Sequence, residues 1–377
     1  MHTGPGNPCR GRTLEDTLRI TSRKSLFGSL AVVGAVALLA GCASAPTATT
    51  ETSAKSDFLP CIVSDVSGFN DHSFNQLALA GVTTAAEKIG SKSIKVQSKT
   101  ENDYASNIAS LIAQKCNLIV AAGFNLVAAV KTAATANPTT NFAMIDDNSM
   151  TLANVKSVVY ETNEAAFLGG YAAASYSKSG VVATYGGAKY PSVTLYMDGF
   201  VDGVKYFNKQ KSKNVQVLGW NVETQNGTFV GGFTDQGLSN TITKNFLDQK
   251  ADVIVVVSGN LYQGAAAAIK ASGGDAVLEG VDADVYNTDP ANKSIMLTSI
   301  MKNLEPSVKA VIEQAAGSKT FDNSAYVGDL KNNGVGIAPF HDFESKVTPS
   351  LADELAKIKA GIIDGSIKTS SPSSLKK

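Results

Sequence analysis

The sequence contains few of the residues that bind soft metals or build a nucleophile–base pair. There are only 4 Cys and 3 His among 377 residues, and no Cys-x-x-Cys or His-x-x-x-His spacing occurs. Zinc sites use such clusters, so metal catalysis has little support and we expect neither a metal nor a cofactor. Beyond residue 41 the only histidines are His72 and His341, and the sequence has no Gly-x-Ser-x-Gly motif. These absences argue against an esterase or a protease.

The chain also lacks an excess of charge of either sign. Lys plus Arg number 33 and Asp plus Glu number 33, which gives a formal net charge of zero. Nucleic-acid-binding proteins usually carry a basic surface, so we expect no nucleic-acid partner. The 44% hydrophobic and 18% charged content is that of a globular protein. It excludes disorder and collagen, and the length suits two domains.

Long hydrophobic runs are missing as well, apart from one short run near the N-terminus. Residues 26–40 are uncharged and follow Arg19, Arg23 and Lys24. This run is shorter than the roughly 20 apolar residues of a membrane span. A basic segment, an apolar stretch and small residues before a cysteine are typical of an export signal. We therefore predict that residues 1–41 form a signal peptide.

The end of this segment reads Leu-Ala-Gly-Cys and resembles the bacterial lipoprotein box. Cys42 would receive lipid on its sulfur and become the first mature residue. The mature protein would then lie at the extracytoplasmic face of the cell membrane, held by its lipid anchor. Residues 1–18 carry Glu15 and Asp16 and are unlike the start of a signal peptide, so we expect translation to begin downstream.

The mature chain begins with a polar stretch and retains two further cysteines. Residues 42–56 are mostly Ala, Thr and Ser, which predicts a flexible tether. Cys61 and Cys116 each open an apolar run, and we interpret these runs as neighbouring parallel strands. In an exported protein they could form a disulfide, but two buried free thiols fit the sequence equally well.

Short runs of β-branched residues alternate with helical stretches after the tether. This alternation is typical of parallel sheets covered by helices on both faces. We expect strands at 58–65, 94–97, 118–121, 142–145 and 155–160, then at 181–185, 215–220, 253–257, 277–281 and 295–301. The pattern predicts an α/β protein with two lobes. We assign 57–162 and 284–335 to lobe 1, 163–283 and 336–365 to lobe 2, and 366–377 to a frayed tail.

Polar residues follow several of these strands. In open α/β sheets, ligands bind at the carboxyl ends of the strands. The residues at those positions are Asp65, Asp146, Asp147, Gly259, Asp282, Asp284 and Lys302. Each acidic residue could equally cap a helix or fill a turn, as could Asp71 or Ser73 before the helix that we expect at 74–89. Together they predict a binding site between the lobes.

Two aromatic residues accompany these polar groups. Phe74 opens a predicted helix, and Phe233 follows a pair of glycines, so either could stack on a flat ligand. Asp146 and Asp282 could also form an acid–base pair for glycoside hydrolysis. Gly186, Gly187, Gly231 and Gly232 lack dinucleotide-binding spacing and are interpreted as turn signals.

Five segments of the chain resemble the basic membrane protein family of bacterial lipoproteins, and within it the purine nucleoside receptor A-like binding proteins. These segments are 65–76, 161–171, 196–204, 280–284 and 297–302. The resemblance implies a type I periplasmic-binding-protein fold, with two Rossmann-like lobes joined by a hinge. It also implies a monomeric binding protein, not an enzyme, that delivers guanosine, adenosine or inosine to an ABC permease.

The resemblance also implies roles for individual residues. Asp65, Asn75 and Asp146 would meet the base or the sugar from the first lobe, and Phe74 would stack on the purine. From the facing lobe, Phe233 would supply the second stacking surface and Gly259 a backbone contact. Asp282 would accept hydrogen bonds from both ribose hydroxyls, with Lys302 beside it.

The chain departs from the family pattern after one strand. The loop 258–264 carries the bulky Leu261 and Tyr262, which we expect to reshape the pocket, and Val285 replaces a common Gln. Two alternatives therefore stay open. The same fold could bind a sugar or another small polar metabolite, stacked on Trp220 or Tyr262, or the protein could be a nucleoside hydrolase.

Overall fold

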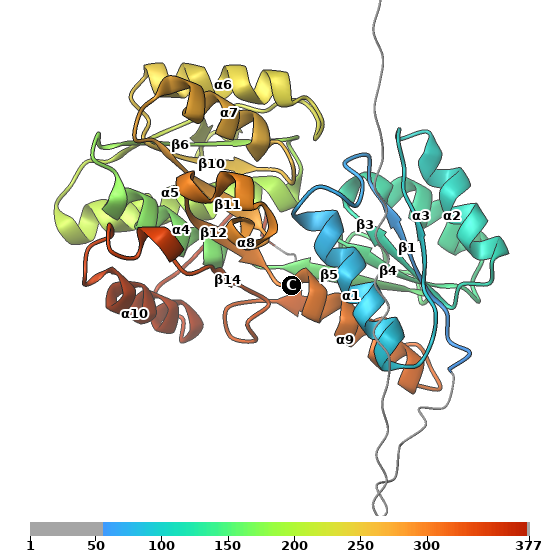
Figure 1. Ribbon diagram of the computed structural model, residues 1–377. Helices are drawn as coiled ribbons and strands as arrows, with labels where there is room; N and C mark the ends of the chain where they lie inside the picture. The colour runs from blue at the N-terminus through green and yellow to red at the C-terminus, as the bar shows by residue number, and fades with distance from the viewer. Residues whose placement is uncertain (1–55, 375–377) are drawn as a thin grey trace, which may run out of the picture. The chain divides into compact units, whose positions relative to one another are not determined.

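The computed structural model describes residues 56–374, which form two parallel-stranded sheets flanked by helices (Figure 1). The first sheet has the strand order β13-β5-β4-β3-β1-β2, and all its neighbouring strands are parallel. Its strands are β1 (Pro60–Ser64), β2 (Ile94–Val96), β3 (Leu118–Ala122), β4 (Asn141–Ile145), β5 (Val155–Tyr160) and β13 (Tyr326–Gly328). The strands β1 and β3 are fully buried apolar runs, as expected where helices cover both faces.

The second sheet has the order β14-β12-β11-β10-β6-β7 and is parallel except for the pair β12–β14. Its strands are β6 (Val181–Gly186), β7 (Gln216–Leu218), β10 (Val253–Val257), β11 (Val277–Asp282), β12 (Met296–Lys302) and β14 (Val335–Ile337). The strand expected at 215–220 is broken at Gly219, whose φ of +88° favours glycine. Beyond the break, β8 (Trp220–Asn221) pairs with β9 (Asn226–Gly227).

Helices cover both faces of each sheet, as Figure 1 shows. In the first lobe, α1 (Phe74–Lys88) and α9 (Leu304–Gly317) pack together on one face, and α2 (Asp103–Ala113) and α3 (Val127–Ala136) cover the other. In the second lobe, α4 (Thr162–Tyr176) and α5 (Pro191–Lys211) cover one face, and α6 (Gln236–Asp248) and α7 (Tyr262–Ser272) the other. Short helices α8 (Val285–Thr288), η1 (Phe124–Leu126), η2 (Pro290–Ile295) and η3 (His341–Phe343) complete the connections.

The last helix, α10 (Leu351–Ile363), packs against α4 of the second lobe. Leu351, Leu355, Ile358 and Ile362 are buried on its inner side. Their spacing of about one helical turn produces a single apolar stripe, which anchors the helix to the lobe.

The chain passes between the lobes after β5, after β12 and between β13 and β14. Backbone hydrogen bonds hold these crossings together, with Glu161 N donating to Gly328 O at 2.8 Å and Asn303 N donating to Gly334 O at 2.9 Å. Hinge motion between two lobes concentrates in a few such connecting residues. The prediction of two parallel-sheet lobes is thus confirmed.

One predicted lobe boundary is wrong. We expected residues 284–335 to belong to lobe 1, but β12 pairs in parallel with β11 in the second sheet. The helix α8 also packs against β12. The return to the first lobe therefore comes at Asn303, because β12 completes the second sheet before the chain crosses back.

We expected the C-terminal tail to be frayed, but it packs against the second lobe as far as Ser374. Asn163 Nδ2 donates to Thr369 Oγ1 at 3.2 Å, and Thr194 Oγ1 and Ser373 Oγ are 2.6 Å apart. The Ser371 hydroxyl donates to a carboxylate oxygen of Asp198. These side-chain hydrogen bonds supply contacts that the composition of the tail alone does not predict.

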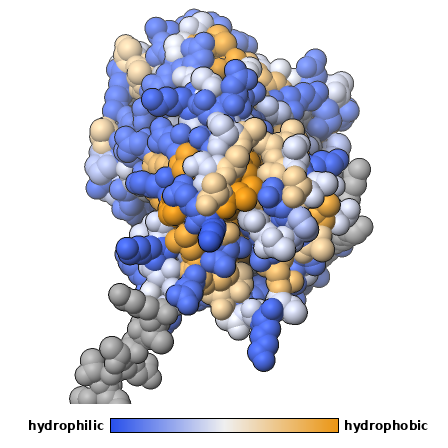
Figure 2. Space-filling view, turned by 90° about the vertical axis from the view of Figure 1, so that its right-hand side faces the viewer, coloured by the Kyte–Doolittle hydropathy of each residue, from blue (hydrophilic) through white to orange (hydrophobic). Residues whose placement is uncertain are grey.

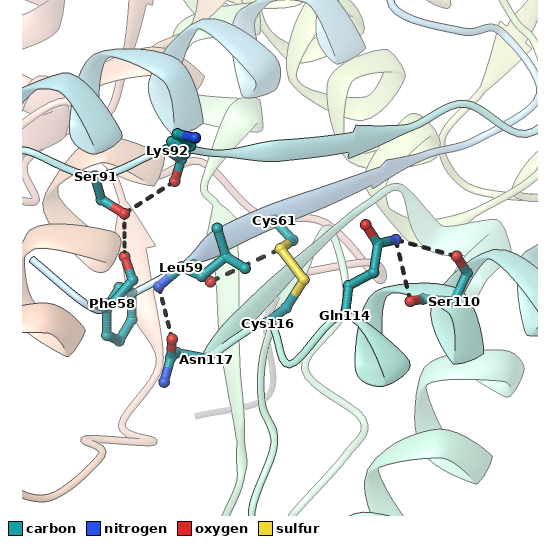
Figure 3. Close-up of a disulfide and its surroundings, with 9 residues drawn as sticks. All are labelled: Phe58, Leu59, Cys61, Ser91, Lys92, Ser110, Gln114, Cys116 and Asn117. Atoms are coloured by element: carbon teal, nitrogen blue, oxygen red, sulfur yellow. Dashed lines mark hydrogen bonds between the residues drawn. A yellow bond between two sulfur atoms is a disulfide. The ribbon is translucent and has the colours of Figure 1, made fainter.

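The two cysteines left open by the sequence form a disulfide between Cys61 in β1 and Cys116 just before β3 (Figure 3). The strands β1 and β3 are hydrogen-bonded neighbours, and the two Cα atoms are 5.9 Å apart. This separation lies in the usual range for a bridge. The disulfide lies at the amino end of β1, whereas Asp65 follows its carboxyl end.

The molecular face in Figure 2 is mostly hydrophilic, with apolar residues gathered near its centre. Among the described helices, none combines the length and the apolar character needed to cross a bilayer. The predicted signal peptide, Cys42 and most of the tether lie outside residues 56–374.

Candidate functional site

A cavity lies where the carboxyl ends of strands from both sheets face each other. It is lined by all eight residues that we predicted to contact a ligand: Asp65, Phe74, Asn75, Asp146, Phe233, Gly259, Asp282 and Lys302. Its volume is about 60 Å³, which holds only a few water molecules. A ligand with a ring system needs more room than this, so the residues lining the cavity must move to admit it.

The first lobe contributes a network of Asp65, Asn75 and Asp71. Asn75 Nδ2 donates to Asp65 Oδ1 at 2.9 Å and to Asp71 Oδ2 at 3.1 Å, while Asn75 Oδ1 accepts from the Asp65 backbone N–H. These contacts fix the orientation of the Asn75 amide. Burial raises the pKa of Asp65 to about 6, although hydrogen bonds from Ser67 and Asn75 oppose the shift.

Asp71 also serves as the cap of α1. Its carboxylate accepts backbone N–H groups of Ser73, Asn75 and Gln76 at 2.8 to 3.1 Å. These donors have no partner inside the helix, so an acidic side chain here stabilises the helix start. The sequence left Asp71 and Ser73 as candidate caps of this helix, and Asp71 is the one whose side chain caps it.

The second lobe contributes Lys302, which contacts carboxylates from both lobes. Its Nζ lies 2.9 and 3.0 Å from the two carboxylate oxygens of Asp146 and 3.5 Å from Asp282 Oδ1. Burial alone would lower the pKa of Lys302, but the two carboxylates more than offset it and raise the pKa. The lysine therefore stays charged inside the cleft.

Both carboxylates next to Lys302 come from residues with an unusual backbone. Asp146 has φ +70° and Asp282 has φ +66°, and each directly ends or follows its strand. Left-handed backbone is uncommon outside glycine, though Asp tolerates it better than most residues. Such conformations are found disproportionately at functional sites, where the surrounding fold enforces them.

Tyr196 holds one oxygen of Asp282. Its hydroxyl donates to Asp282 Oδ1 at 2.9 Å, and burial together with Asp282 raises the pKa of Tyr196 well above its usual value. The phenol therefore remains protonated and stays a donor. No hydrogen bond from a described residue reaches Asp282 Oδ2, and Asp282 lines the cavity.

Two phenylalanines reach the cavity from opposite lobes. Phe74 is the first residue of α1, and Lys302 Nζ lies 5.0 Å from the centre of its ring. Phe233 rests on the backbone of Gly187, where an added Cβ would come within 2.5 Å of the ring. Two backbone hydrogen bonds fix the loop that carries Phe233, because Gly231 N and Gly232 N both donate to Gly187 O. The glycine pairs thus position an aromatic ring.

Sequence reasoning missed a second aromatic pair at the cavity. Phe124 of the first lobe and Tyr190 of the second have ring centres 4.7 Å apart, and Tyr190 lies 5.9 Å from Phe233. The other lining residues are Ser67, Asp71, Gly123, Asn125, Ser192, Val193, Tyr196, Val257 and Ser258. Most of them lie just beyond strands or at helix starts, which is the positional signal that could have found them.

Two sequence-based expectations about aromatic and bulky residues are wrong. Leu261 and Tyr262 do not line the cavity, since both are buried in the hydrophobic core at the start of α7. Trp220 is also buried, and its indole N–H donates to Asp198 at 2.7 Å. Neither Trp220 nor Tyr262 lines the cavity, so neither offers the stacking surface of the sugar alternative.

Hydrogen bonds across the cleft hold the lobes close together. Ser73 Oγ donates to Val281 O at 2.8 Å, and Thr288 Oγ1 donates to His72 O at 2.6 Å. Gly259 lies close to Asp71, since a Cβ added at Gly259 would come within 3.1 Å of the Asp71 carboxylate. The structure is therefore a closed form, and these contacts must break for the cleft to open.

Within residues 56–374, no group of three or more His, Cys, Asp or Glu side chains is placed to hold a metal ion. Asp284, also singled out in the sequence, pairs instead with His341 Nε2 at 2.9 Å and does not line the cavity. The arrangement at the cavity offers hydrogen-bond acceptors, one cation and flat apolar surfaces.

Comparison with known proteins finds relatives along most of the chain. The profile of a family described as "ABC transporter substrate-binding protein PnrA-like" matches residues 59–368. The "ABC transporter nucleoside-binding protein BmpA" of Lactococcus lactis is 29% identical over 355 residues, covering 90% of this chain and 96% of that protein. "Basic membrane protein A" of Borreliella burgdorferi is 27% identical and covers 79% of this chain and 84% of its own length.

Solved structures show the same fold. A solute-binding protein of an ABC transporter from Aeropyrum pernix has a TM-score of 0.74 at 23% identity and covers 84% of this chain and 94% of its own. A second, from Conexibacter woesei, has a TM-score of 0.62 at 21% identity and covers 83% of this chain and 99% of its own. The expected fold of type I solute-binding proteins is confirmed.

Proposed function

Because the chain belongs to the PnrA-like family of ABC transporter substrate-binding proteins, we propose that it binds a purine nucleoside between its lobes for uptake through a permease. A member of this family is a binding protein and not an enzyme, so the nucleoside hydrolase alternative is abandoned. Such a protein works with a small-molecule ligand and the permease of its transporter. The identity of the ligand is the part that we infer from the site.

One observation carries the proposal: Phe74 and Phe233 reach a single cavity from opposite lobes, beside the cluster of Lys302 and its carboxylates. Two rings that close from either side suit a flat heteroaromatic base. Base–aromatic stacking contributes roughly 1–3 kcal/mol per base. Closure of the lobes would complete this sandwich only when a planar ligand separates the rings.

The polar end of the cavity suits a ribose. Asp282 Oδ1 is held by Tyr196, and Oδ2 is left to accept a ligand hydroxyl. A carboxylate makes charge-assisted hydrogen bonds that are roughly twice as strong as neutral ones. Lys302 Nζ lies 3.5 Å from the same Asp282 oxygen and lines the cavity beside it.

The edge of the base would meet Asp65 and Asn75. The fixed Asn75 amide and the Asp65 carboxylate present acceptors to ring and exocyclic N–H groups. Adenosine, guanosine and inosine differ in those groups, so this pair sets the preference among purines. A sugar ligand is less well suited, because its expected stacking residues lie outside the cavity.

We also propose that the protein is anchored by lipid on Cys42 at the extracytoplasmic face of the membrane. The support is the short apolar run before Leu-Ala-Gly-Cys in the sequence. Replacement by Cys42→Ser should move the protein from the membrane fraction to the soluble fraction after export. Continued membrane association of that variant would refute the anchor.

Isothermal titration calorimetry tests the ligand. Guanosine, adenosine and inosine are titrated into the purified protein, with ribose and free purine bases as comparison ligands. We expect saturable heat with at least one nucleoside and a much weaker response with ribose. Binding of ribose or another sugar in place of every nucleoside would contradict the ligand assignment.

Asp282→Asn is the matched variant for this experiment. Asn tolerates the left-handed backbone at position 282 and keeps the shape of the Asp side chain. The substitution therefore removes only the charge. We expect at least a tenfold loss of nucleoside affinity with the melting temperature nearly unchanged. Asp353→Asn on the exposed side of α10 is the control and should leave the affinity unaltered.

A further inference from the structure

A second, roomier cavity adjoins the proposed nucleoside site. The two cavities share Phe124, Asp146, Ser192 and Lys302 in their linings. The second has a volume of about 550 Å³, within the range of small-molecule sites. It lies on the side of Lys302, which is the side where the proposed function places the sugar.

The C-terminal tail forms part of the wall of this cavity. Pro372, Ser373 and Ser374 line it together with Asp147 of the first lobe and Leu195 of α5. The tail is held in place by the Thr194–Ser373 contact of 2.6 Å and by the bond from Ser371 to Asp198. Both lobes and the tail therefore enclose one space.

The lining is polar but supplies little charge. Thr162 Oγ1 is buried and has no hydrogen-bond partner among the described residues, and Thr162 lines the cavity. Hydroxyl groups of Ser149, Ser192 and Ser374 and the amide of Asn148 lie around the same space.

The charges of this cavity disfavour anions. Asp146 and Asp147 both line it, and Lys302 is its single basic lining residue in the described chain. Lys302 is already in contact with Asp146 and Asp282 and has no unshared charge to offer. A phosphate in this cavity would therefore face an excess of negative charge from its described lining residues, and like charges repel.

We propose that the second cavity holds an uncharged substituent on the sugar of the bound nucleoside, so that the protein accepts 5′-substituted nucleosides but rejects nucleotides. This inference rests on the proposed function, since it needs a nucleoside whose sugar points toward Lys302. The proposal is supported by the volume of the second cavity, by the hydroxyl-bearing residues that line it and by the negative charge of its carboxylates.

Calorimetry with three ligands tests the proposal. The tightest-binding nucleoside among guanosine, adenosine and inosine is compared with its 5′-O-acetyl ester and its 5′-monophosphate. We expect the ester to bind within tenfold of the parent and the monophosphate at least 100-fold more weakly. If no nucleoside binds at all, the proposed function fails; if the parent binds and the ester does not, only this inference fails.

A bulky residue in the tail provides the second test. Ser374→Trp should fill the second cavity, whereas Ser370→Trp is the control because Ser370 is exposed and does not line it. We expect Ser374→Trp to weaken the ester at least tenfold while the parent nucleoside changes less than twofold. Equal weakening of both ligands, or no effect on the ester, would overturn the inference.

Discussion

The ammonium of Lys302 in the second lobe and the carboxylate of Asp146 in the first are joined by contacts of 2.9 and 3.0 Å across the cleft. Both side chains are largely buried, with Lys302 3% and Asp146 11% exposed. A buried ion pair gains little net free energy, yet removal of one partner is costly because the other charge is left unpaired. The pair therefore links closure of the lobes to the charge state of the site.

Lys302→Met should destabilise the closed protein. The methionine leaves the carboxylates of Asp146 and Asp282 buried without a cation, which typically costs about 3–5 kcal/mol. Urea unfolding at pH 7 measures the free energy of unfolding. The control is Lys309→Met, which removes the partly exposed pair of Lys309 with Glu313 at 3.5 Å and should change the free energy of unfolding by less than about 1 kcal/mol. If the two substitutions lower the free energy of unfolding equally, the contacts of Lys302 in the cleft add no special stability.

Nucleoside affinity should fall as the pH drops from 7 to 5. Burial raises the pKa of Asp65 to about 6, so at pH 5 only about one carboxyl in ten is ionised and able to accept N–H groups of the base. We expect roughly tenfold weaker binding at pH 5 than at pH 7, measured by calorimetry. Asp65→Asn should make the affinity independent of pH over this range. If the affinity of that variant still falls at low pH, a group other than Asp65 is responsible.

The same group affects stability with the opposite sign. The folded pKa of Asp65 lies above the unfolded value of 3.8, so the folded state binds the proton more tightly. Between about pH 4 and pH 6 the ligand-free protein should therefore lose stability as the pH rises, by roughly 3 kcal/mol from this group alone. Chemical unfolding of the wild type and of Asp65→Asn across this range isolates the contribution.

Ser73→Ala should speed ligand release. The hydroxyl of Ser73 donates to Val281 O across the cleft only when the lobes are closed. Its loss should favour opening by about 1 kcal/mol, which corresponds to about a fivefold faster dissociation rate. Stopped-flow displacement measures that rate, with Ser110→Ala on the exposed side of α2 as the control. A rate equal to that of the wild type would mean that this contact does not hold the closed form.

Reduction of the Cys61–Cys116 disulfide should lower stability without affecting ligand binding. The bridge closes a loop of 55 residues, and its loss typically costs about 2–5 kcal/mol. It lies at the amino end of β1, at the far end of the strand from Asp65. Thermal unfolding and nucleoside titration with and without reductant separate the two effects. A large loss of affinity under reducing conditions would contradict the prediction.

The elements and the site residues of this fold could be read from local patterns. Buried β-branched runs such as β1 and β10 have no polar alternation, and Asp65 and Asp282 stand at the carboxyl ends of their strands. Because the parallel strands of one sheet end at the same edge, strand position predicts which residues of each lobe lie at its binding edge. The pairing of Cys61 with Cys116 needed the structure, since sequence spacing does not fix the distance between Cα atoms.

The sequence by itself determined the alternation of strands and helices and the polar residues at strand ends, since these depend on local hydrophobic periodicity. Only the tertiary structure decided that β12 belongs to the second sheet and that the Phe124 ring contacts the Tyr190 ring. The same holds for the C-terminal tail, which lines a second cavity. These features join residues far apart in the chain. They follow from sheet pairing and closure of the lobes, which no local pattern records.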